Sequence, residues 1–123
     1  MEVEEIIKLY QDSAINYGIA SDKLEDSKVI NKYHDVIIEC FLSLQKKGEN
    51  ALLQLKTLTS HKDSNVVLWA ATHLLSVDEG YAREIIQRLI DNDFLIGFDA
   101  KMILKEWDKG RLNFEYNGYS PIA

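Results

Sequence analysis

The chain lacks most of the features that cross-link or interrupt a protein fold. It has one cysteine, Cys40, so it can form neither an internal disulfide nor a thiolate cage for a metal. Its one proline, Pro121, follows every predicted helix and therefore interrupts none. Runs that alternate β-branched and polar residues are missing, which leaves little material for a sheet. These absences favour an all-α protein.

Charge and hydropathy exclude two further classes. The chain carries 20 acidic and 14 basic residues, a formal net charge of -6, whereas binding to phosphate backbones needs clustered Lys and Arg. No run approaches the roughly 18 apolar residues of a membrane span, and the opening MEVEEIIKLY lacks the basic start of a signal peptide. We therefore expect a cytoplasmic protein with neither a nucleic-acid partner nor a membrane partner.

Apolar residues recur at helical spacing along the 123 residues, which predicts a single α-helical domain with about six helices. Two N-terminal helices are expected in 1–48, the first from about Glu2 to Tyr17 with Gly18 as its stop, the second opened by Asp22 and Glu25. Shorter helices follow in 49–110, and 111–123 forms a tail. Gly48 and Gly110 are expected to end the second and sixth helices.

The shorter helices carry small residues where two helices must approach closely. Ala70 and Ala71 lie in one such helix, and Ala100 follows Ala70 after thirty positions. This recurrence favours two HEAT-like helical hairpins of an α-α superhelix, formed by the third helix with the fourth and the fifth with the sixth. Such folds are binding scaffolds more often than enzymes.

The string LWAATHLL, followed by GFDAKMILKEWDKGRLNF, resembles a small bacterial HEAT-like family that is catalogued as a domain of unknown function. The resemblance covers the C-terminal half well, although Val67 stands where the family usually has an arginine. It implies a helical fold without known enzymatic residues. By analogy, small helical proteins of this kind also resemble immunity proteins of polymorphic-toxin and contact-dependent inhibition systems. The matching residues are Leu68, Trp69, Ala70, Ala71, Thr72, His73, Gly97, Phe98, Asp99, Ala100, Met102, Leu104, Trp107, Gly110, Arg111 and Leu112.

No group of residues forms a catalytic or metal-binding motif. The histidines His34, His61 and His73 lack a partner at metal-ligand spacing, and the glycines form no phosphate-binding loop. We expect no catalytic residues, no metal site and no cofactor.

Binding residues are predicted on the later helices. Trp69 and His73 lie four residues apart on one helix face and could anchor a protein partner, although Trp69 could equally belong to the core. Asp91, Asp93 and Asp99 cluster near one turn and could pair with Lys or Arg of that partner. The leading hypothesis is an immunity protein, a monomer or weak dimer, that covers the basic active site of a toxin. The alternative is a general scaffold or regulatory adaptor with a hydrophobic contact face.

Overall fold

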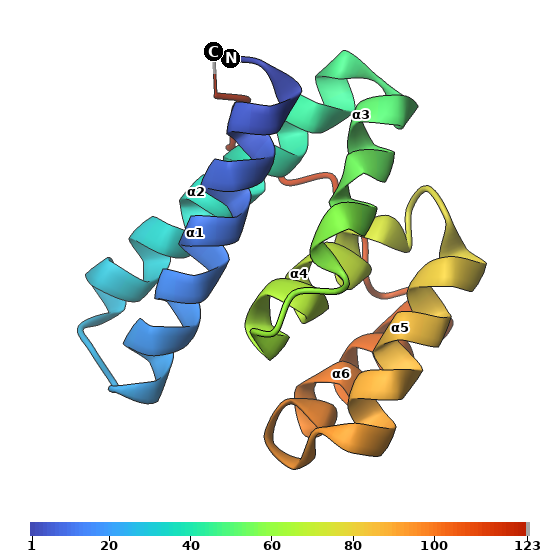
Figure 1. Cartoon of the computed structure of the whole chain (residues 1–123). Coiled ribbons are helices and arrows are strands. Elements are labelled where there is room, and N and C mark those ends of the chain that lie inside the picture. The colour runs from blue at the N-terminus through green and yellow to red at the C-terminus, as the bar shows by residue number, and fades with distance from the viewer. Residues whose placement is uncertain (123) are drawn as a thin grey trace. The chain divides into compact units, whose positions relative to one another are not determined.

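The computed structural model describes residues 1–122, and every regular element among them is helical (Figure 1). The predicted all-α fold with six helices is confirmed. None of the described helices is long and apolar enough to cross a membrane. The elements are α1 (Val3–Asp22), α2 (Ser27–Lys47), α3 (Glu49–Leu53), the 3-10 helix η1 (Gln54–Leu58), α4 (Ser64–Leu74), α5 (Glu79–Asn92) and α6 (Phe94–Asp108).

The chain forms two compact units. The first comprises Met1–Gln54 together with the segment that starts at Tyr116, and the second comprises Leu55–Glu115. Residues 49–54 therefore group with the N-terminal helices, and the predicted tail of 111–123 is divided between the units. The predicted hairpin of the third and fourth helices spans the boundary between the units and stays a prediction, as does the interpretation of the chain as a single domain.

In the first unit, α1 and α2 pack against each other as a helical hairpin (Figure 1). Tyr10 on α1 and Phe41 on α2 are fully buried, and the ring of Tyr116 meets Phe41 edge-on with 5.7 Å between centroids. Burial raises the pKa of the Cys40 thiol to about 12, so this thiol stays protonated and packs as a small apolar group. The Ser43 hydroxyl donates to the carbonyl of Ile122 at 2.9 Å, which holds the C-terminal segment against α2.

The turn between α1 and α2 differs from the sequence-based prediction. Gly18 does not end α1. The helix continues to Asp22, and Ala20, which follows the glycine, is buried in the packed face of the helix. The first residue with a left-handed backbone is Leu24, at φ 52°. The N-cap of α2 is Asp26, whose carboxylate accepts from the Lys28 amide at 2.8 Å. Gly48 does end α2 as predicted, at φ 118°.

In the second unit, α4 packs against α5 and α6, which themselves form a hairpin. The predicted small residues Ala70, Ala71 and Ala100 are all fully buried. At Gly97 the two helices approach closely, since an added Cβ would lie 3.3 Å from the carbonyl oxygens of both Leu89 and Ile90. A side chain at position 97 would make this contact tighter than most Cβ contacts in proteins, so glycine suits the packing of α6 on the α5 backbone.

Two glycine substitutions test this close approach. Gly97→Ala should lower the free energy of unfolding by about 1 kcal/mol, because the overpacking against two backbone oxygens outweighs the gain in helix propensity. Gly80→Ala is the matched control in α5, where an added Cβ meets nothing within 4 Å, and it should raise stability by about 0.5 kcal/mol. Urea unfolding measures both, and equal stabilisation by the two alanines would contradict the close approach.

Candidate protein-binding surface

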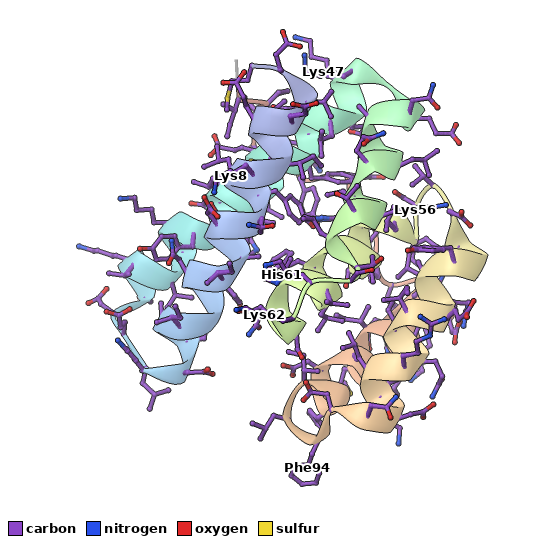
Figure 2. All side chains as sticks on the ribbon, in the orientation of Figure 1. Lys8, Lys47, Lys56, His61, Lys62 and Phe94 are labelled. Carbon is purple, nitrogen blue, oxygen red and sulfur yellow. The ribbon has the colours of Figure 1, made fainter. Side chains whose placement is uncertain are left out.

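One face of α6 carries large apolar side chains that the fold leaves in solvent. Phe94 is 96% exposed, Leu95 85%, Phe98 69% and Met102 40%. Their spacing of three and four residues places them side by side on the helix. We call these four residues the α6 strip. Phe94 projects away from the ribbon at the start of α6 in Figure 2.

The α6 strip is exposed because α6 buries its opposite face. Gly97 and Ala100 are buried, and Ile103, Leu104 and Trp107 continue that inner face at helical spacing. Single exposed apolar residues are common on protein surfaces, but a contiguous group that includes two phenylalanines is a candidate interaction site. Sequence reasoning missed the strip. The available signal was that Phe94 and Phe98 lie off the stripe formed by Ala100, Leu104 and Trp107.

Charges of both signs border the α6 strip. Asp99 follows Leu95 by four residues and lies along one side, whereas Lys101 follows Phe98 by three and lies along the other. Both are exposed, as is Asp91 at the end of α5. The Asp91 carboxylate accepts a hydrogen bond from the Gln87 side-chain amide at 3.0 Å. Asp91 therefore lies at the end of the α5–α6 hairpin where the α6 strip begins.

The third predicted acid, Asp93, has a structural role. Its Oδ1 accepts from the backbone amides of Leu95 and Ile96 at 3.1 and 3.0 Å, which caps α6, and its Oδ2 accepts from the Ser64 hydroxyl at 2.5 Å. The Ser64 hydrogen bond, followed by the two amides, holds the pKa of Asp93 below its ordinary value. Both carboxylate oxygens thus accept hydrogen bonds within the chain, and the pairing of Asp93 with a partner stays a prediction.

The two predicted anchors, Trp69 and His73, differ in exposure, and the two alternatives for Trp69, anchor or core, stay open. His73 is fully buried, with its ring 5.9 Å from the Trp69 ring and 5.3 Å from that of Phe114 by centroids. Trp69 is half-buried. An interface anchor needs an accessible side chain, and His73 instead packs in an aromatic cluster that continues from Phe114 to Trp107. The physical reason is that α4 is buried on nearly every side. The spacing of Trp69 and His73 by four residues places them on one face, but it does not indicate whether that face is exposed.

Residues 4–108, from α1 to the end of α6, match the protein family described as "Domain of unknown function (DUF2019)". The chain belongs to the DUF2019 family. The resemblance to a family of unknown function is therefore confirmed, while the resemblance to immunity proteins stays a prediction. Comparison with curated proteins gives no match, and comparison with solved structures gives none. The DUF2019 match includes the α6 strip and Asp93 and ends before the C-terminal segment.

Among residues 1–122 of this DUF2019 member, no three His, Cys, Asp or Glu side chains come together as a possible metal site. The acids near the start of α5 take part in ion pairs within the second unit. Asp78 contacts Lys56 at 2.7 Å and Glu79 contacts Arg83 at 2.9 Å, and these hydrogen bonds lower the pKa of each carboxyl. Their charges, like that of Asp93, are partly compensated within the chain.

The role of Asp93 in this DUF2019 chain predicts a dependence of stability on pH. Its folded pKa lies below the ordinary value of 3.8, so its stabilisation is complete above that value and is lost as the pH falls through the folded pKa. Asp93→Ala should cost about 1 kcal/mol at pH 7, the usual contribution of an N-cap, and should flatten the loss of stability below about pH 4.

Asp91→Ala is the control for Asp93→Ala, because Asp91 lies in the last turn of α5, is not an N-cap, and accepts a hydrogen bond from the exposed Gln87 side chain. Its cost should stay within about 0.5 kcal/mol, as is usual at surface positions. Thermal unfolding between pH 2 and pH 7 measures both variants. If the two variants lose stability equally and with the same pH profile, Asp93 has no capping role.

Proposed function

We propose that this protein is a non-enzymatic protein-binding module that binds its partner through the α6 strip, and that the partner is a toxin that it neutralises. The observation that carries the proposal is the exposure of Phe94, Leu95 and Phe98 on one helix face. Burying a phenylalanine side chain contributes about 1.5–3 kcal/mol, so two phenylalanines and a leucine provide the apolar centre of a specific interface. The partner therefore needs an apolar patch that matches the α6 strip.

The acidic residues beside the α6 strip indicate which charges should surround the matching patch on the partner. Asp99 lies along one side of the strip and Asp91 at the turn before it, in a chain of net charge -6. A basic surface on that side of the patch would pair with both carboxylates and would be steered toward the acidic protein. An enzyme that cleaves nucleic acid has such a surface around its active site, because its substrate is rich in phosphate. The mechanism is then steric, since the bound hairpin covers the site.

A general scaffold or adaptor is the second candidate, and one observation favours it. Lys101 and Lys105 are exposed beside and beyond the α6 strip, so the strip is bordered by both signs of charge rather than by a continuous acidic surface. Binding by an adaptor would rest on the apolar contacts and would tolerate salt. Binding by an immunity protein would be very tight toward one toxin and would weaken as salt rises.

Co-expression tests the proposal. Cells that express the product of the reading frame directly upstream should stop growing, and co-expression of this chain should restore growth. Phe98→Ser should weaken binding about 30-fold or more and abolish the rescue, because it removes an aromatic group from the centre of the interface. The substitution should leave the melting temperature nearly unchanged, since Phe98 is mostly in solvent in the free protein.

Leu24→Ser is the matched control, because Leu24 is 88% exposed but lies in the first unit, outside the α6 strip. It should rescue growth as well as the wild type does. Loss of rescue by both variants, or by neither, would contradict binding through the α6 strip. An upstream product that is not toxic would contradict the immunity function and leave the adaptor as the better candidate.

Charge reversal tests the electrostatic part separately. Asp91→Lys together with Asp99→Lys should slow association by roughly tenfold at low salt and flatten its dependence on ionic strength, with little change in the dissociation rate. Surface plasmon resonance at several salt concentrations measures both rates. Because neither residue caps a helix, the fold should be retained, and an unchanged association rate would contradict the electrostatic contribution.

A further inference from the structure

The second unit contains an open pocket of about 280 Å³ that the α6 strip does not include. Its walls come from the turn that contains Thr59, Ser60 and His61, from the first turn of α4, and from the last two turns of α5. Ligand pockets usually measure roughly 300 to 1,000 Å³, so this one suits a molecule smaller than a drug.

Both apolar and polar residues line the pocket. Val67 from α4 with Ile85 and Leu89 from α5 form an apolar part, and Val67 and Ile85 are each only 7% exposed. The polar part includes the hydroxyls of Ser60 and Ser64, the guanidinium-bearing Arg88 and the amide-bearing Asn92. A small number of polar groups beside an apolar surface is the usual composition of a site for a small molecule.

The pocket has no acidic residue in a chain that is otherwise acidic. All nine lining residues belong to the described part of the chain, and none of them is Asp or Glu. The carboxylates nearby are already engaged, because Glu84 pairs with Arg88 at 2.7 Å, Asp63 caps α4 and Asp93 accepts from Ser64 at 2.5 Å. The Ser64 hydroxyl thus donates to Asp93, and the donors that face the pocket come from Arg88 and Asn92, in a lining without a carboxylate.

Arg88 keeps donors to spare. Its Nη2 donates to Glu84, and the guanidinium has further N–H groups in a fixed planar arrangement that suits carboxylate and phosphate oxygens. The amide of Asn92 uses one N–H on the carbonyl of Arg88 and retains a second. Lys62, which follows the lining residue His61 on the same turn, is exposed (Figure 2).

We propose that this pocket is a binding site for a small organic anion, whose carboxylate or phosphate contacts Arg88 and Asn92 and whose short apolar part lies on Val67, Ile85 and Leu89. The site is separate from the proposed contact with a protein partner. Either anionic group fits the same donors, and the experiment distinguishes them.

Nuclear magnetic resonance on the full ¹⁵N-labelled chain tests the site with three probes: butyrate, inorganic phosphate and neutral butyramide. Butyrate or phosphate should shift the amides of residues 59–64 and 88–92 with a dissociation constant on the order of 1 mM, as expected for fragments of this size. Butyrate alone identifies a carboxylate site, and phosphate alone a phosphate site. Butyramide should bind at least about tenfold more weakly than the better anion, because it lacks the charge that Arg88 would pair with.

Arg88→Gln should weaken anion binding about tenfold, because it removes a charge-assisted hydrogen bond. Arg83→Gln is the control, since Arg83 is also on α5 and pairs with Glu79 four residues earlier, and with Asp108 of α6, but does not line the pocket. Its anion affinity should remain that of the wild type. No shift with either anion up to about 50 mM, equal binding of butyramide, or equal loss in both variants would overturn the proposal.

Discussion

The second unit depends on the hydrogen bonds of one carboxylate, that of Asp93. Its two oxygens satisfy the first amides of α6 and the hydroxyl of Ser64 at the start of α4. Backbone amides at a helix start have no partner within the helix, so this carboxylate both starts α6 and fixes its beginning beside α4. Because Phe94 and Leu95 follow directly, the same interaction determines where the α6 strip begins.

The packing of α6 then decides which of its faces is left in solvent. Gly97 allows the α5 backbone to approach within contact distance, and Ala100 continues that close contact, so the small residues lie inward. A helix so packed cannot also bury Phe94 and Phe98. Because the small residues of α6 face the core, its large apolar side chains face the solvent. The resulting exposed patch is the physical basis of the proposed binding function.

The helical class, the number of helices and much of the core follow from sequence, because the periodicity and the glycine stops are local signals. The buried positions of Ala70, Ala71 and Ala100 and the end of α2 at Gly48 were predicted in this way. The roles of Asp93 and His73 and the exposure of the α6 strip were not. An N-cap aspartate such as Asp93 looks in sequence like any surface acid near a turn, and the burial of His73 depends on neighbours as distant in the chain as Phe114. The exposure of Phe98 likewise depends on which face of α6 packs against α5, and the local sequence pattern does not indicate that face.

The central claim is that a protein partner covers the α6 strip, and site-specific photo-crosslinking in the cells that naturally make this protein tests it most directly. A photoreactive phenylalanine analogue at position 98 should give a crosslinked species with one other protein, whereas the same group at position 24, which is more open to solvent and lies in the first unit, should give none. Crosslinks from position 24 alone, or an absence of crosslinks from position 98, would contradict the account.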